Sequence, residues 1–288
     1  MQIDFTPVHE YIREKNVTLF ELSIMTEKGI FSVTPGNGNP CNNSYSVSKA
    51  FAATGIGLLW DEGKIGLDEK VLDILKDERI QYEDANWEKV TVRNALQHKM
   101  GVNEGYLDID VEDIYSYGTD DFLKILFGKS LPFEPGTHFQ YTDAAYYLIS
   151  RIVEARAGEK LDEYLMRKLM YPMRVQECAW SRCPKNHPMG ATGLYIRSSD
   201  MVKLGFLYAM GGEIYGKRLL SEDWIREDQK NCFAFYPAGA GDLLGKGGMR
   251  GQMLMYSPNQ KYAAAWHSYA EDDRASGLTE AVYDIMKG

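Results

Sequence analysis

Segments near both ends of this chain have residue patterns typical of β-strands, and the long middle part has patterns typical of helices. Residues 17–34, VTLFELSIMTEKGIFSVT, contain two runs rich in β-branched and aromatic residues around a turn at 26–29. Residues 251–268, GQMLMYSPNQKYAAAWHS, contain two more runs around a turn at 257–260, and a helix is predicted to follow. Hairpins at the two ends predict one antiparallel sheet that both termini build together.

The sequence therefore predicts an α/β (α+β) fold in which an antiparallel sheet is flanked by helices. A mainly helical region is inserted between the two parts of the sheet. We place the sheet part at residues 1–60 and 183–288 and the helical region at 61–182, together forming one integrated unit. With 288 residues and 44% hydrophobic side chains, the chain is long enough to bury a substantial core.

Composition and charge argue against several kinds of partner and cofactor. The net charge of -9, without a basic patch, argues against a nucleic-acid partner, and no apolar run is long enough for a membrane span. The first residues, MQIDFTPVHEYIREKN, contain no signal peptide, so we expect a cytoplasmic protein, with a trimmed secreted form as the alternative. The four cysteines and five histidines lack metal-site spacing, so we expect no metal and no other cofactor. The oligomeric state stays open.

Residues 43–66, NSYSVSKAFAATGIGLLWDEGKIG, combine closely spaced serines with a lysine at the start of an apolar run. We expect a buried helix over residues 46–62, on which Ser46 and Lys49 are neighbours at i and i+3. A serine hydroxyl becomes a good nucleophile only when a base takes its proton. A lysine can be that base when apolar surroundings and the helix N-terminus lower its pKa. The alternative is a capping serine beside a solvated lysine, because roughly one S-x-x-K match arises by chance in such a chain.

Two further segments contain candidate site residues. Residues 131–154, LPFEPGTHFQYTDAAYYLISRIVE, place Tyr141 between a Pro-Gly turn and a helix, where it can relay a proton if cations stabilise its phenolate. Residues 243–257, LLGKGGMRGQMLMYS, place Lys246 and two glycines at the head of a predicted strand, where a substrate backbone can lie. Taken separately both patterns are weak, and Lys-Gly-Gly is more often an ordinary turn.

In this order, the three patterns resemble the S-x-x-K, Y-x-N and K-T-G motifs of the serine penicillin-recognising enzymes. The sequence is most similar to the branch that contains class C beta-lactamases, DD-peptidases and esterases. The phrases VTVRNALQHKMGV, EPGTHFQYTDAAYYLISRIVE and GLYIRSSDMVKLGFLYAMGG also look like phrases of that branch. The resemblance runs from about Val17 to Ser268 and implies a beta-lactamase/transpeptidase-like fold.

The resemblance also implies an activity. Ser46 would attack a carbonyl and form an acyl-enzyme, with Lys49 and Tyr141 sharing the role of base in an order that stays open. The backbone N–H groups of Ser46 and Met249 would form the oxyanion hole. The residues implied in substrate binding are Asp143, Lys246, Gly247, Gly248 and Met249. Arg250 is a further candidate for substrate binding, because it lies next to the expected oxyanion-hole donor Met249. The substrate would be a small amide or ester, with esterase or small-amide hydrolase activity expected first, a peptidase for D-amino-acid substrates next and an efficient beta-lactamase last.

Two positions depart from the family pattern. Asp143 stands where an asparagine is usual, and a carboxylate only accepts hydrogen bonds. It would pair with Lys49 and keep it protonated, so that the base role moves toward Tyr141. We hypothesise that Asp143 disfavours penicillins and favours a substrate with an amine. Gly247 replaces a threonine whose hydroxyl helps to hold the substrate carboxylate, and the glycine leaves room for a bulkier or carboxylate-free acyl group.

Two other functions compete with this interpretation. Asp143 and Gly247 would also suit a catalytically inactive binding protein that kept the fold. A Ser-His-Asp hydrolase is the other rival, but the sequence contains no G-x-S-x-G. His98, in the phrase HKMG, is expected to support the fold and not the reaction.

Overall fold

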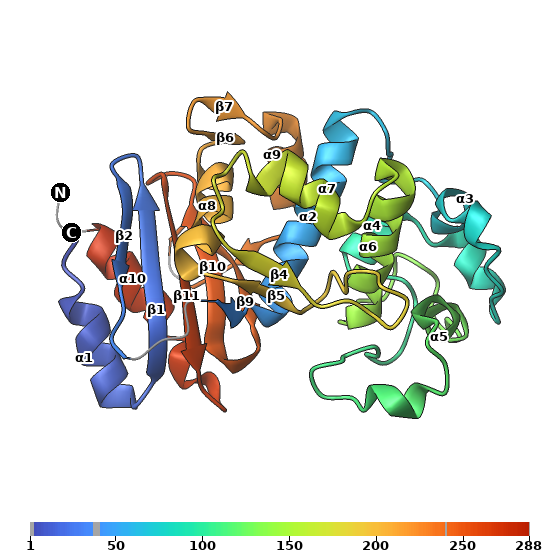
Figure 1. The fold of residues 1–288 in the computed structure, drawn as a ribbon, viewed down its shortest axis with the longest axis horizontal. Coiled ribbons are helices and arrows are strands. Elements are labelled where there is room, and N and C mark those ends of the chain that lie inside the picture. The colour runs from blue at the N-terminus through green and yellow to red at the C-terminus, as the bar shows by residue number, and fades with distance from the viewer. Residues whose placement is uncertain (1–2, 37–40, 240, 288) are drawn as a thin grey trace.

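The computed structural model describes residues 3–36, 41–239 and 241–287. Its main sheet has six antiparallel strands in the order β2-β1-β11-β10-β9-β8 (Figure 1). These strands are β1 (Thr18–Thr26), β2 (Gly29–Val33), β8 (Tyr236–Pro237), β9 (Leu244–Gly248), β10 (Gln252–Ser257) and β11 (Tyr262–Tyr269). The N-terminal and C-terminal hairpins join through β1 and β11, where Ile24 lies opposite Ala264. The predicted fold class, including a sheet built from both termini, is confirmed.

Helices cover both faces of this sheet. The terminal helices α1 (Thr6–Lys15) and α10 (Leu278–Lys287) pack on one face, and α8 (Ser198–Ala209) packs on the other (Figure 1). Along β1 successive side chains alternate between the faces, so Leu22 and Ile24 join the core under the terminal helices. Ser23 points to the other face, where its buried hydroxyl forms a 2.8 Å hydrogen bond with that of Ser198 on α8.

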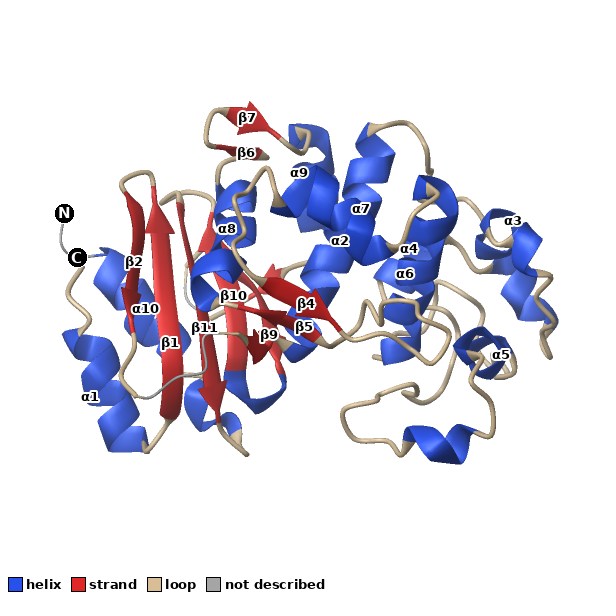
Figure 2. Cartoon of the chain, viewed as in Figure 1, coloured by secondary structure: helices blue, strands red, loops and turns tan. Residues whose placement is uncertain are grey.

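The remaining helices form most of the other half of the molecule, shown in Figure 2. They are α2 (Ser48–Asp61), α3 (Val71–Ile74), α4 (Val92–Leu96), α5 (Phe122–Phe127), α6 (Asp143–Ala157), α7 (Leu161–Leu165) and α9 (Glu222–Asn231). Two small sheets complete the fold, built from β3 (Asn42–Asn43), β4 (Cys178–Trp180) and β5 (Leu194–Ile196), and from β6 (Glu213–Ile214) and β7 (Lys217–Arg218). The division of the chain at residues 60 and 183 stays a prediction.

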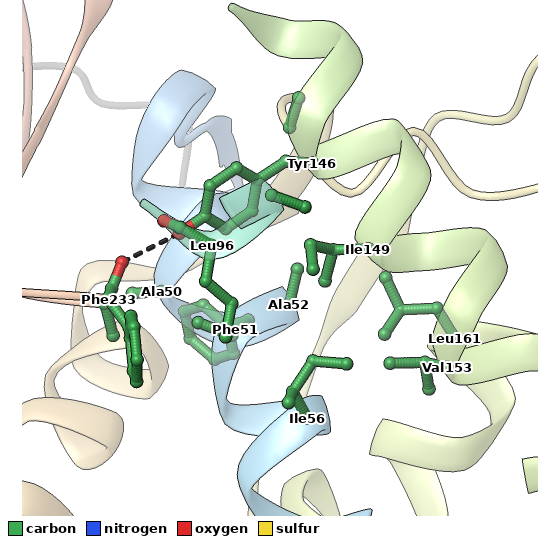
Figure 3. Close-up of a cluster of buried hydrophobic side chains, with 14 of the residues drawn as sticks. Ala50, Phe51, Ala52, Ile56, Leu96, Tyr146, Ile149, Val153, Leu161 and Phe233 are labelled. Atoms are coloured by element: carbon green, nitrogen blue, oxygen red, sulfur yellow. Dashed lines mark hydrogen bonds between the residues drawn. The ribbon is translucent and has the colours of Figure 1, made fainter. Parts of the chain in front are cut away.

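Helix α2 runs through the core and packs against α6 (Figure 3). Ala52 and Ile56 on α2 lie on the side toward Ile149 and Val153 on α6. Gly57 allows the close approach expected from the sequence, because a Cβ atom there would lie only 2.4 Å from the Trp224 ring of α9. The buried helix that begins at the S-x-x-K segment is therefore held between other helices.

One strand assignment from the sequence was wrong. Lys246, Gly247 and Gly248 were expected at the head of the strand that contains residues 252–257, but they form the last part of a separate strand, β9. Gly248 lies opposite Gln252 and Lys246 opposite Leu254, so a tight turn returns the chain along β10. Glycines have low strand propensity, and here the cross-strand pairing overrides that preference.

Across the three described ranges, none of the helices is both long and apolar enough to cross a membrane.

The carboxyl group of Asp228 on α9 is fully buried and makes the stability of the fold depend on pH. Oδ1 accepts a 2.7 Å hydrogen bond from the Ala234 N–H, and Oδ2 has no partner among the described residues. Burial raises the pKa of Asp228 to about 8, whereas an unfolded aspartate titrates near about 4. The native state therefore holds an extra proton between these values, and the free energy of unfolding falls as pH rises through this window.

We expect Asp228→Asn to flatten this fall in the free energy of unfolding, as measured by urea denaturation between about pH 5 and 9. The amide keeps the hydrogen bond to Ala234 and does not ionise. Equal pH dependence in the original protein and the variant would contradict the assignment.

Candidate active site

Ser46 lies in a tight turn immediately before α2. The sequence placed it in the first turn of the helix, but residues Tyr45–Val47 form a 3-10 turn and the α-helix begins at Ser48. Tyr45 adopts a left-handed conformation with φ of 46°, which is rare for a bulky side chain and is found where the surrounding structure enforces it. The Ser48 hydroxyl donates a 2.7 Å hydrogen bond to the Tyr45 carbonyl and closes the turn.

Lys49 is completely buried and directs its ammonium group at Ser46. Nζ lies 3.0 Å from Ser46 Oγ, 2.7 Å from Asp143 Oδ1 and 2.9 Å from the Ala191 carbonyl oxygen. An ammonium group has three N–H donors and no acceptor. All three donors are therefore in use, and one of them holds the serine hydroxyl.

The pKa of Lys49 is raised, whereas the apolar run and the helix N-terminus alone led us to expect a lowered pKa. Burial does lower the pKa of Lys49, but the negative charge of Asp143 and the contact with Tyr141 outweigh burial and leave it raised. The apolar helix environment by itself would produce the expected lowering. Because Asp143 is only 5% exposed, little water screens the attraction between its carboxylate and the Lys49 ammonium group. The structure thus contains the Lys49–Asp143 pair that the sequence suggested.

Tyr141 approaches Ser46 from the segment before α6. Its hydroxyl donates a 2.8 Å hydrogen bond to Ser46 Oγ. The Nζ atoms of Lys49 and Lys246 lie 4.9 and 5.3 Å from the centre of its ring. The three segments singled out in the sequence, distant along the chain, therefore meet at Tyr141, which bonds to Ser46 and lies beside Lys49 and Lys246.

Lys246 contributes a second buried ammonium group. It is 6% exposed, and its Nζ lies 4.9 Å from the centre of the Tyr236 ring as well as close to Tyr141. Burial, with a further contribution from the charge of Lys49, lowers the pKa of Lys246 to about 7, against an opposing effect of Asp143. The positive charge at this position therefore decreases as pH rises through 7.

The end of β9 lies against the turn that contains Ser46. A Cβ atom on Gly248 would lie 2.4 Å from the Ser44 carbonyl oxygen, so only glycine fits there. At Gly247 the nearest atoms would be 3.9 Å away, so the space of the missing threonine side chain is open. Met249 follows directly. The segments that carry the two expected oxyanion-hole donors, the backbone N–H groups of Ser46 and Met249, are thus adjacent.

Arg250 adopts a left-handed conformation with φ of 63° beyond Met249. Its guanidinium lies 5.1 Å from the centre of the Tyr269 ring and 3.9 Å from a carboxylate oxygen of Glu271. These contacts direct the side chain toward the C-terminal part of the chain. A substrate contact by Arg250 stays a prediction.

Asp108 and Asp110 are site residues that the sequence did not single out. One carboxylate oxygen of Asp108, one of Asp110 and one of Asp143 all lie within 4.8 Å of one another. Burial raises the pKa of Asp108 and of Asp110, and the charge of Asp143 raises both further. Asp110 also accepts a hydrogen bond from the Thr192 hydroxyl. The pair occurs in an irregular loop, where no periodicity marks it as part of the site.

The sequence from residue 43 to residue 284 matches the family model described as Beta-lactamase. The chain belongs to this beta-lactamase family, and the family resemblance expected from the sequence is confirmed.

Two curated relatives match shorter regions. Protein flp of Staphylococcus aureus strain N315 is 21% identical over 157 residues, which cover 54% of this chain and 31% of the relative. An N-acetylmuramyl-L-alanine amidase of Bacillus subtilis strain 168 is 29% identical over 132 residues, covering 44% and 30%. The matches span about a third of the length of these relatives.

Solved structures show the same fold at low sequence identity. A Bacillus anthracis protein assigned as a 6-aminohexanoate-dimer hydrolase has a TM-score of 0.82 and 16% identity, covering 98% of this chain and 81% of its own. A penicillin-binding protein homologue from Caulobacter crescentus has a TM-score of 0.78 and 17% identity, covering 98% and 97%. A family VIII carboxylesterase has a TM-score of 0.74 and 17% identity, also covering 98% and 97%. The fold is that of beta-lactamase-related hydrolases and penicillin-binding-protein homologues.

Proposed function

We propose that the protein is a serine hydrolase that forms an acyl-enzyme through Ser46 on a small amide or ester substrate. The observation that carries the proposal is the pair of hydrogen bonds that Ser46 Oγ receives, 3.0 Å from Lys49 Nζ and 2.8 Å from the Tyr141 hydroxyl. Membership of the beta-lactamase family supports it, as does the fold shared with a carboxylesterase.

In this proposal Tyr141 is the first base. Lys49 is held protonated by Asp143, and its three N–H donors are engaged, so it has no lone pair for the serine proton. The ammonium groups of Lys49 and Lys246 lie 4.9 and 5.3 Å from the centre of the Tyr141 ring and place positive charge next to the proposed base. The Tyr141 hydroxyl first releases its proton to solvent, and the phenolate then takes the Ser46 proton along the 2.8 Å contact while Oγ attacks the substrate carbonyl carbon.

The remaining steps use the same groups. The carbonyl oxygen becomes negatively charged and accepts hydrogen bonds from the backbone N–H groups of Ser46 and Met249. Tyr141 returns its proton to the leaving amine or alkoxide as the bond to the carbonyl carbon breaks, which leaves the acyl group on Ser46. A water molecule then gives a proton to Tyr141 and attacks the ester, and the proton passes back to Ser46 Oγ as the acid leaves.

We further propose that the site prefers a substrate with an amine. Asp108, Asp110 and Asp143 bring three carboxylates together beside Lys49, and Lys49 is hydrogen-bonded to Asp143 alone among them. A cationic amine on the substrate would be attracted by the remaining negative charge. The Bacillus anthracis protein of the same fold, assigned as a hydrolase of the 6-aminohexanoate dimer, supports this preference because that amide carries an amine.

Asp143→Asn is expected to lower kcat/KM for an amine-bearing amide, such as the 6-aminohexanoate dimer, about tenfold relative to p-nitrophenyl butyrate, equivalent to about 1.4 kcal/mol. It should also increase acylation by a fluorescent penicillin, because an amide side chain can donate to the substrate carbonyl. Asp68→Asn is the matched control, since Asp68 is an exposed carboxylate paired with Arg93 away from the site. Unchanged preferences in Asp143→Asn would refute the amine hypothesis.

The proposed function is tested by incubating the protein with p-nitrophenyl acetate, p-nitrophenyl butyrate and a fluorescent penicillin. Turnover is followed by absorbance, and the adduct is followed by intact mass and located by peptide mapping. An acyl adduct on Ser46 supports the proposal. If neither adduct nor turnover occurs with these substrates or with an amine-bearing amide, the non-catalytic binding protein becomes the better account of the same fold.

A further inference from the structure

The side chain of His98 lies against the ring of Tyr141. It follows α4 and is only 1% exposed. The His98 and Tyr141 rings are stacked, with centres 4.5 Å apart and planes inclined by 30°. His98 also contacts the ring of Tyr146 on α6, at 5.1 Å, and Tyr146 is fixed by a 2.7 Å hydrogen bond from its hydroxyl to the Phe233 carbonyl (Figure 3). The imidazole is thus packed between the Tyr141 ring on one side and the Tyr146 ring on the other, and it is the imidazole that contacts Tyr141.

His98 also holds the backbone on both sides of Tyr141. Its carbonyl oxygen accepts a 2.9 Å hydrogen bond from the Gln140 N–H, and its Nδ1 accepts a 3.3 Å hydrogen bond from the Thr142 N–H. His98 has a left-handed φ of 55°, a conformation that L-residues adopt where surrounding contacts enforce it. Three contacts, two to the backbone and one to the ring, therefore fix the position and direction of the phenol.

We propose that His98 is a positioning residue of the catalytic site, which holds the Tyr141 hydroxyl at hydrogen-bond distance from Ser46 Oγ. This inference rests on the proposed function. The sequence suggested only a role in the fold for His98. A residue with only that role would affect kcat equally with and without the Tyr141 hydroxyl, whereas a positioning residue would not.

The charge state of His98 fits this role. Burial lowers the pKa of His98 well below its usual value, and the nearby charges of Lys246 on β9 and Lys49 on α2 lower it further. The imidazole therefore stays neutral around pH 7. Because the Thr142 N–H donates to Nδ1, the ring proton of the neutral form is on Nε2. A protonated imidazole would place an N–H against the Thr142 N–H and break this contact.

Two substitutions separate the contacts that His98 makes. His98→Phe keeps an aromatic ring and removes the acceptor for Thr142. His98→Asn keeps an oxygen acceptor near the position of Nδ1, tolerates the left-handed backbone, and removes the ring. We expect each to lower kcat for p-nitrophenyl butyrate about tenfold or more with KM changed less than about twofold, because the transition state and not substrate binding depends on Tyr141.

The decisive measurement is a double-mutant cycle with Tyr141→Phe. If His98 acts through Tyr141, His98→Phe or His98→Asn lowers kcat in the original protein but changes the residual kcat of Tyr141→Phe less than about twofold. Equal losses in the two backgrounds would overturn the proposal, as would an unchanged kcat in the single variants. If His98→Phe does not fold, His98→Asn provides the cycle.

Tyr146→Phe is the matched control, since it disturbs the same aromatic cluster without removing a contact to Tyr141. It should lower the free energy of unfolding, because the buried carbonyl groups of Leu96 and Phe233 lose the hydroxyl that donates to them, and it should leave kcat within about twofold. A kcat loss in Tyr146→Phe as large as in His98→Phe would show a general packing effect and overturn the proposal. Absence of Ser46-dependent turnover in the unaltered protein would instead overturn the proposed function itself, and this assignment with it.

Discussion

Ser46→Ala is expected to reduce turnover of p-nitrophenyl butyrate at least about a thousandfold and to abolish the acyl adduct. Alanine has no oxygen to attack the carbonyl, so no acyl-enzyme can form. The remaining hydrogen-bond donors around the site would support only a small residual rate by binding and polarising the substrate. Turnover is measured by release of p-nitrophenol, and acylation by intact mass after brief incubation.

Two neighbouring serines provide controls for this result. The Ser44 hydroxyl is buried without a hydrogen-bond partner among the described residues, so Ser44→Ala breaks no hydrogen bond and should keep turnover within about twofold. Ser48→Ala removes the 2.7 Å bond to the Tyr45 carbonyl and tests how much the tight turn matters. An acyl adduct that persists in Ser46→Ala, or maps to Ser44, would identify a different nucleophile.

Local patterns made much of the fold and site predictable. Two hairpins, each with a marked turn, define the sheet, and the i, i+3 spacing of Ser46 and Lys49 survives although a 3-10 turn replaces the first helical turn. Both geometries place the two side chains on one side of the chain. The position of Tyr141 near Ser46 could also be predicted from its motif. Tyr141 lies just before α6, and α6 packs on α2, the helix that follows Ser46.

Features that depend on distant contacts could not be predicted in this way. Strand β9 is marked by three glycines and becomes a strand because β10 pairs with it. The raised pKa of Lys49 depends on a carboxylate 94 positions away, and the cluster of Asp108 and Asp110 around that carboxylate depends on an irregular loop. The contact of His98 with Tyr141 is likewise tertiary. A local sequence pattern contains no information on contacts between residues that are distant along the chain, because the packing of the whole chain determines them.

Lys49→Met is expected to lower the free energy of unfolding by about 3–5 kcal/mol, because it leaves the Asp143 carboxylate buried without its cation. It should also lower kcat/KM at least about a hundredfold, because the ammonium that holds Ser46 Oγ and faces the Tyr141 ring is lost. The two effects have different physical causes. Urea denaturation measures the first and steady-state kinetics with p-nitrophenyl butyrate the second.

The double variant Lys49→Met with Asp143→Asn separates these causes. Removing both charges eliminates the unpaired buried carboxylate, so most of the lost stability should return, as it does when a buried ion pair is replaced as a unit. Activity should stay low, because neither methionine nor asparagine restores a positive charge beside Ser46 and Tyr141. If turnover returned together with stability, Lys49 would be only a structural counter-ion of Asp143, and Tyr141 would depend on Lys246 alone for positive charge. If the single variant lost no stability, the buried Lys49–Asp143 pair would itself be refuted.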